Sequence, residues 1–243
     1  MIVVIRKNNI LLIALILVLS VLLFSLNFGL IGSTPVSNGA GTQRTILLDP
    51  GHGGEDPGAV SIYSGLKEKE VNLYITTKLK ELLEHENYNV ILTRSEDRLE
   101  YQSGTTSETS MRRQDLTRRK KMMDESAADI IVSIHMNKLD ENKDSKWFGA
   151  QTFYPPNSPE GQKLAVSIQS ALKELVDPNN KREALLKKEP IIIFKDVKKI
   201  IAIVEGGFLS NPDEEKRIAT KEYQDKLAIA IKEGINRYFG NKK

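Results

Sequence analysis

The chain has 243 residues, of which 28% are charged and 40% are hydrophobic, and it contains no cysteine. This composition is ordinary for a folded domain, and the length suits one large domain or two small ones. The absence of cysteine excludes disulfides, thiolate zinc sites and a cysteine nucleophile.

The first residues form a hydrophobic segment. Arg6 and Lys7 precede an apolar run over residues 10–26 that only two serines interrupt. With the apolar residues up to position 31 the run is about 20 residues long, the length that spans a bilayer. The basic pair comes first, so the positive-inside rule predicts that the rest of the chain is exported. We expect residues 1–31 to be a membrane anchor or a signal segment. An uncleaved anchor is favoured, because the run is long for a signal peptide and no clear cleavage site follows.

Residues 32–43 are small and polar, and Pro35, Gly39 and Gly41 among them are typical of a flexible linker. The folded domain is therefore predicted to cover residues 44–243. The segment before residue 44 holds two basic and no acidic side chains, so the exported part has a net charge near +1, compared with +3 for the whole chain. A charge this small gives no reason to expect a nucleic-acid partner.

After the linker, short apolar runs alternate with segments of helical periodicity. The predicted helices are 67–86, 112–127, 159–175 and 222–239. The predicted strands are 45–49, 89–93, 130–134 and 150–154, and two further apolar runs lie at 191–194 and 200–204. Charged or small polar residues predict loops at 102–110 and 138–146. This alternation predicts a single α/β domain, with a mostly parallel or mixed twisted sheet that helices cover on both faces.

The first predicted strand runs directly into a loop of unusual composition, DPGHGGEDPG at residues 49–58. Four glycines allow the backbone a positive φ and close approach of other groups, and two prolines stiffen the loop. His52 is held inside this loop, which is the kind of placement that a metal site needs. The alternative is an ordinary turn that carries an exposed histidine.

Three of the apolar runs end in polar groups that could act together. The runs ending near positions 48, 134 and 204 lead into His52, His135 and Glu205. Ligands and catalytic groups of open α/β sheets gather beyond the carboxyl ends of the strands. If the three strands are parallel neighbours, these side chains converge; otherwise each only terminates its own strand.

Two neutral imidazoles and one carboxylate are a good ligand set for a single Zn²⁺, with a fourth position left for water. His52 and His135 are the two imidazoles. The carboxylate should come from the start of the helix 67–86, where spacing alone leaves Glu68 and Glu70 as alternatives. A second carboxylate that does not bind the metal is then needed to move protons, and Glu205 suits that role.

Four motifs carry a resemblance to a known family. They are DPGHGG at 49–54, EKEVNL at 68–73, SIHMN at 133–137 and EGGFLSN at 205–211. In this order they resemble the zinc-dependent N-acetylmuramoyl-L-alanine amidases of the amidase-3 type. The resemblance implies that His52, Glu68 and His135 bind one zinc ion and that Glu205 is catalytic. It thereby selects Glu68 over Glu70.

The family implies an exported peptidoglycan hydrolase that cleaves the amide between N-acetylmuramic acid and the L-Ala of the stem peptide. A short domain behind a membrane anchor, without a separate wall-binding module, resembles the spore-cortex, germination-specific branch, whose cleavage precedes formation of the muramic δ-lactam. We expect action at the extracytoplasmic face of the membrane, or secretion if the signal is cleaved. The sequence does not indicate whether the enzyme also binds a protein partner. The alternatives are a non-catalytic peptidoglycan-binding or regulatory domain and a zinc peptidase acting within the stem peptide. No G-x-S-x-G motif supports a serine hydrolase.

The predicted helix 112–127 is strongly basic. Its cations could face an anionic wall polymer or a membrane, but a solvated helix face is the expected role. They are Arg112, Arg113, Arg118, Arg119, Lys120 and Lys121.

Overall fold

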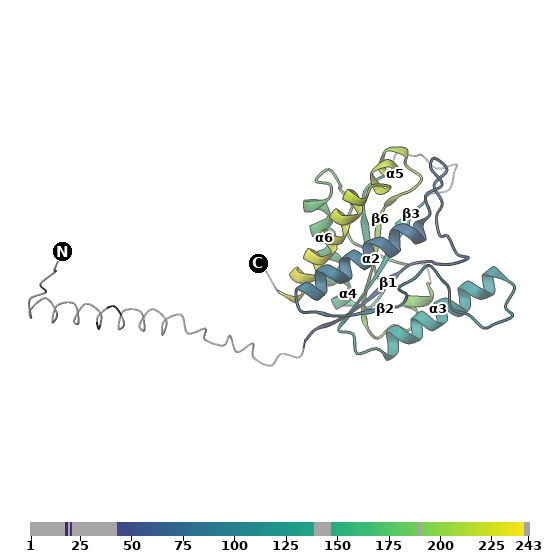
Figure 1. Ribbon diagram of the computed structural model, residues 1–243, viewed down its shortest axis with the longest axis horizontal. Helices are drawn as coiled ribbons and strands as arrows, with labels where there is room; N and C mark the ends of the chain where they lie inside the picture. The colour runs from purple at the N-terminus through teal and green to yellow at the C-terminus, as the bar shows by residue number, and fades with distance from the viewer. Residues whose placement is uncertain (1–17, 19, 21–42, 139–146, 189–190, 241–243) are drawn as a thin grey trace, which may run out of the picture. The chain divides into compact units, whose positions relative to one another are not determined.

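The computed structural model describes residues 18, 20, 43–138, 147–188 and 191–240 (Figure 1). The chain divides into two units, Met1–Thr42 and Gln43–Lys243, and the second is described below. The predicted anchor and linker lie almost wholly outside the described residues, as does most of the predicted loop 138–146. Among the residues that are described, no helix combines the length and apolar character needed to cross a membrane.

The domain is built on one six-stranded mixed sheet with the order β2-β1-β3-β6-β4-β5. The first four strands in this order are parallel, β4 runs antiparallel to β6, and β5 is parallel to β4. The strands are β1 (Thr45–Pro50), β2 (Asn89–Leu92), β3 (Ile130–Asn137), β4 (Gln151–Tyr154), β5 (Leu185–Leu186) and β6 (Ile200–Phe208). Every residue of β1 is buried, which explains why its central residues Ile46, Leu47 and Leu48 are all apolar and do not alternate with polar ones.

Helices cover both faces of the sheet, as the sequence predicts (Figure 1). The α-helices are α2 (Glu68–His85), α3 (Glu108–Glu125), α4 (Pro159–Leu175), α5 (Pro212–Ile218) and α6 (Lys221–Phe239), and η1 (Ile192–Phe194) is a 3₁₀ turn. Helices α2, α4 and α6 pack on one face over the larger hydrophobic core, whereas α3 and η1 cover the smaller core on the other face. Neighbouring residues of β1 alternate between the two cores: Ile46 and Leu48 enter the larger one and Leu47 the smaller.

The structure departs from the predicted elements in four places, the smallest of which is the unpredicted two-residue strand β5. Helix α3 begins at Glu108, inside the predicted loop 102–110. The apolar run 191–194 forms η1 and does not join the sheet, because a run of four apolar residues does not specify a strand. Helix α5 was not predicted, although Asn211 caps it by accepting from the backbone nitrogens of Asp213 and Glu214. That Asn-Pro start is a recognisable helix signal.

Candidate metal centre

The three strands that were expected to converge are neighbours in the sheet. Strand β3 lies between β1 and β6, and all three are parallel. The register pairs Asp49 with Ser133 and His135 with Glu205, so the polar ends of the strands meet at one edge. This confirms the prediction that the strand ends bring His52, His135 and Glu205 to a common region.

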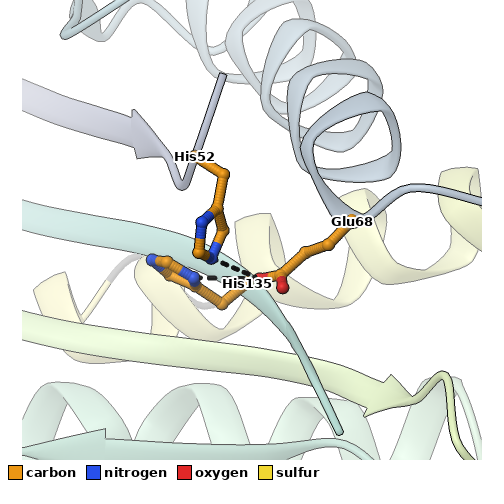
Figure 2. Close-up of side chains that lie close together, drawn as sticks. All are labelled: His52, Glu68 and His135. Carbon is orange, nitrogen blue, oxygen red and sulfur yellow. Dashed lines mark hydrogen bonds and ion pairs between the residues drawn. The ribbon is translucent and has the colours of Figure 1, made fainter. Parts of the chain in front are cut away.

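Three side chains from different elements meet at this edge (Figure 2). Oε1 of Glu68 lies 3.2 Å from Nε2 of His52 and 3.0 Å from Nδ1 of His135. The three potential ligand atoms all lie within 4.8 Å of one another. Glu68 is 3% exposed, whereas Glu70 is exposed on the outer side of α2. Of the two carboxylates that spacing left open, Glu68 is therefore the one that faces the histidines.

The glycines of the loop after β1 allow this close packing. A Cβ atom on Gly51 would lie 2.1 Å from Cε1 of His135, and one on Gly58 would lie 2.6 Å from Oε2 of Glu68. Either contact is far shorter than van der Waals distance. His52 itself has a φ of +63°, a left-handed conformation that is uncommon outside glycine and is often found at functional sites.

Hydrogen bonds orient the three side chains. Nδ1 of His52 lies 2.8 Å from Oδ2 of Asp56, which leaves Nε2 turned toward Glu68. The Glu68 carboxylate accepts from two backbone nitrogens, that of Ala59 at 2.7 Å and that of Met136 at 3.0 Å. A carboxylate on the outer nitrogen of a metal-binding imidazole is a common supporting feature of zinc sites. Asp56 was not among the predicted site residues, although it lies in the same glycine-rich loop.

The charges of the site stabilise one another. Burial lowers the pKa of His52, but hydrogen bonds and charges from Asp56 and Glu68 outweigh burial and raise that pKa from 6.5 to about 10. Burial raises the pKa of Glu68, but the two histidines outweigh it and hold that pKa well below its usual range. The neighbouring groups therefore favour the ionised form of Glu68 and the protonated form of His52.

Glu205 lies beside this cluster without joining it. It lines the same cavity as His52 and His135, and its Oε2 is buried with no hydrogen-bond partner in the described structure. Burial raises the pKa of Glu205, and the charge of Glu68 acts in the same direction. A buried carboxylate oxygen without a partner, next to a candidate metal site, is suited to receive a proton.

Two buried arginines hold the loop that carries His52. Arg94 donates to the carbonyl oxygens of Pro50 at 2.9 Å and of Gly51 at 3.0 Å. Arg119 donates to the carbonyl oxygens of Pro50 and His52, both at 2.7 Å. The two guanidinium groups thus bind the carbonyl oxygens of three consecutive residues, from the last residue of β1 to His52.

The burial of Arg119 contradicts its expected role on a solvated helix face. Its side chain is 1% exposed and pairs with Asp49 at 3.1 Å and Asp115 at 2.6 Å. An arginine is rarely buried without such partners. The Asp115–Arg119 spacing on α3 was the available signal, since residues four apart on a helix face each other.

The chain is similar to a known protein family, to curated relatives and to solved structures. The family described as N-acetylmuramoyl-L-alanine amidase (Amidase_3) matches residues 46–237. The chain is 36% identical over 199 residues to the germination-specific N-acetylmuramoyl-L-alanine amidase of Bacillus subtilis, covering 82% of this chain and 81% of the relative. The CwlD amidase of Clostridioides difficile, solved in complex with the GerS lipoprotein, is 39% identical with a TM-score of 0.78, covering 82% of this chain and all of that one. An N-acetylmuramoyl-L-alanine amidase of Clostridium difficile 630 is 30% identical with a TM-score of 0.68, covering 83% of this chain and 99% of that one.

Proposed function

The chain belongs to the Amidase_3 family of N-acetylmuramoyl-L-alanine amidases, and from this we propose that it is a zinc-dependent peptidoglycan amidase. It hydrolyses the amide between the lactyl carbonyl of N-acetylmuramic acid and the L-Ala of the stem peptide. The observation that carries this proposal is the cluster of His52, Glu68 and His135 beside Glu205 at one edge of the sheet.

The residues present fit a zinc ion. Two imidazole nitrogens and one carboxylate oxygen form a donor set that catalytic zinc sites use, and the three atoms lie close enough to share one ion. The chain has no cysteine that could form a competing thiolate site. We therefore propose that His52, Glu68 and His135 hold one Zn²⁺. When bound, zinc supplies Lewis-acid chemistry, polarising a carbonyl oxygen and making water more acidic.

The chain's own residues supply positioning and proton transfer. Asp56 fixes the ring of His52 through Nδ1, so that Nε2 faces the ligand cluster. Glu205 takes a proton from the attacking water as the new C–O bond forms. It then passes that proton to the L-Ala nitrogen as the C–N bond breaks, which releases the stem peptide as a free amine.

The relatives support a narrower role in spore-cortex modification. The Bacillus subtilis relative is named as germination-specific, and this chain covers most of its length. Removal of stem peptides would leave muramic acid residues free for later δ-lactam formation. The solved Clostridioides difficile relative is in complex with a lipoprotein, which supports a protein partner for this chain as well.

The proposal also assigns a role to each part of the chain. Residues 1–31 serve as membrane anchor or signal segment, 32–43 as linker and 44–243 as the catalytic domain. The enzyme then acts on the extracytoplasmic side of the membrane, either anchored or, after signal cleavage, secreted. A relative from Staphylococcus saprophyticus that is 29% identical is named as a probable cell wall amidase, which supports action outside the cytoplasm.

Muropeptide analysis tests the proposed reaction. Purified full-length protein is incubated with peptidoglycan, and the products are identified by mass spectrometry together with the metal content of the protein. Free stem peptides with intact glycan strands are the expected result. Fragments cut within the stem would indicate a peptidase, and binding without cleavage would indicate a non-catalytic domain.

A further inference from the structure

The cavity next to the candidate metal centre has a distinctive lining. Its volume is about 370 Å³, and His52, His135 and Glu205 form part of its wall. Two cationic side chains, Arg112 from α3 and Lys187 from the segment after β5, also line it. The rest of the wall holds the apolar side chains Leu99, Leu116, Ile191, Ile192 and Ile193 together with Asp49, Asp56, Asp115 and Arg119, charged groups that pair with one another or with Arg112 and His52. The cavity therefore combines a reaction site, an apolar wall and, beside these paired charges, the two cationic side chains Arg112 and Lys187.

Arg112 is held in a fixed relation to the metal ligands. Its Nε lies 3.2 Å from Oδ1 of Asp56, and Oδ2 of the same carboxylate lies 2.8 Å from Nδ1 of His52. The side chain of Arg112 is nevertheless 45% exposed. Within the described part of the chain, its two terminal nitrogens make no hydrogen bond or ion pair. Arg112 thus presents its two terminal nitrogens beside the reaction site while its Nε pairs with Asp56.

The chemistry of the substrate indicates which part these donors would bind. This inference rests on the proposed amidase function. N-acetylated sugars and the lactyl amide carry no charge, whereas stem peptides carry acidic residues beyond L-Ala. A guanidinium group matches a carboxylate through two parallel hydrogen bonds. A volume of 370 Å³ is at the lower end for small-molecule sites, so the cavity suits a short peptide segment better than a glycan strand.

We propose that Arg112 binds a free carboxylate of the stem peptide and makes the enzyme selective for acidic over amidated stems. Asp56 aligns the guanidinium with the metal ligands, and Lys187 adds positive charge to the same cavity. The apolar wall contacts the aliphatic parts of the peptide. Arg112 is then a specificity-determining residue, whereas its neighbour Arg113 is exposed and lines a separate surface groove.

A pair of substrates that differ only in this charge tests the proposal. Full-length zinc-loaded protein is assayed on muramyl peptides whose residue after L-Ala carries either a free α-carboxylate or the corresponding amide. The wild type should prefer the free acid in kcat/KM by on the order of tenfold or more, as expected for a charge-assisted hydrogen bond. Arg112→Gln should remove this preference mainly through a higher KM for the acid, and Arg112→Lys should restore part of it. Arg113→Gln is the matched control and should keep the wild-type ratio.

The ratio of kcat/KM on the acid to kcat/KM on the amide distinguishes substrate recognition by Arg112 from a purely structural role of that residue. If Arg112 only supported Asp56 and His52, Arg112→Gln would lower the rates on both substrates by the same factor and reduce zinc content, and the proposal would be wrong. Equal cleavage of acid and amide by the wild type would also overturn it. Failure of the wild type to cleave either substrate would overturn the amidase function and this inference with it.

Discussion

At the scale of single residues, the site depends on which of two nearby carboxylates faces the histidines. Glu68 begins α2, is buried, and accepts from the backbone nitrogens of Ala59 and Met136. Glu70 lies two positions later, where the helix turns its side chain outward. The two residues are chemically alike, so they form a natural pair of test and control.

Glu68→Gln is expected to remove tight zinc binding, while Glu70→Gln leaves it unchanged. The amide keeps the shape of the side chain but loses the charge that the cation needs. The loss of affinity should exceed the 10–100-fold typical for removal of a supporting residue. Zinc content after dialysis measures the effect. Stoichiometric zinc in dialysed Glu68→Gln protein would exclude Glu68 as a ligand.

Glu205→Gln is expected to lower the rate of amide hydrolysis by about 10²–10⁴ while zinc stays bound, because the variant loses the proton-transfer group but no metal ligand. The measurement is kcat on a muramyl peptide together with zinc content. Glu222→Gln, at an exposed position on α6, serves as a control for the loss of one carboxylate. A rate within a few-fold of wild type would show that another group transfers the proton.

At the scale of elements, the end of β1 is fixed to α3 by buried charges. Arg119 of α3 pairs with Asp49 of β1, and Asp49 also accepts from the hydroxyls of Thr93 at 2.5 Å and Ser133 at 2.7 Å. Burial raises the pKa of Asp49, but Arg119, these two hydroxyls and the charge of His135 outweigh burial and lower it below its usual value. The folded state therefore favours the ionised form of Asp49.

This pairing predicts how stability depends on pH. The pKa of Asp49 is lower in the folded state than in the unfolded state, where it is about 3.9. The stability that ionised Asp49 contributes is therefore fully present above the unfolded-state pKa and is lost as pH falls through the folded-state pKa. Asp49→Asn should cost about 3 kcal/mol at pH 7, since it leaves Arg119 with one of its two carboxylates. The difference in the free energy of unfolding between the variant and the wild type should become smaller below pH 4. Urea unfolding in the presence of a chelator measures this, and a difference independent of pH would contradict it.

At the scale of the whole molecule, a metal ion would connect parts of the chain that are far apart in sequence. His52 follows β1, Glu68 begins α2 and His135 belongs to β3. These elements contribute to the larger hydrophobic core, so an ion shared among them binds the folded chain and not the unfolded one. Binding should therefore be visible as added stability of the domain.

Zinc is expected to stabilise the folded domain by roughly 2.7 kcal/mol when free zinc is 100 times its Kd. Thermal unfolding of the chelated protein with and without added zinc measures this as a rise in Tm. The Glu68→Gln variant should show little rise at the same concentration. If zinc raised the Tm of both proteins equally, the ion would be binding elsewhere.

The amino-acid sequence by itself determined the elements and their chemistry. Continuous apolar runs predicted the buried strands β1, β3 and β6, periodic spacing predicted α2, α3, α4 and α6, and four ordered motifs indicated the family, all of which the structure and the comparisons confirm. The apolar run 191–194, which forms η1, and the unpredicted helix α5 are exceptions. These properties are encoded locally, within a few residues of each position. The identity of the carboxylate that faces the histidines was not encoded locally, because Glu68 and Glu70 occupy nearly the same place in the pattern.

Only the tertiary structure decided which side chains meet. The burial of Arg119 depends on Asp49 from a strand 70 residues away in sequence, and the link from Arg112 through Asp56 to His52 joins α3 to the loop after β1. Such contacts follow from strand order and from the packing of helices on the sheet. Local periodicity determines whether a segment is a strand or a helix, but it does not determine the neighbours against which that segment packs.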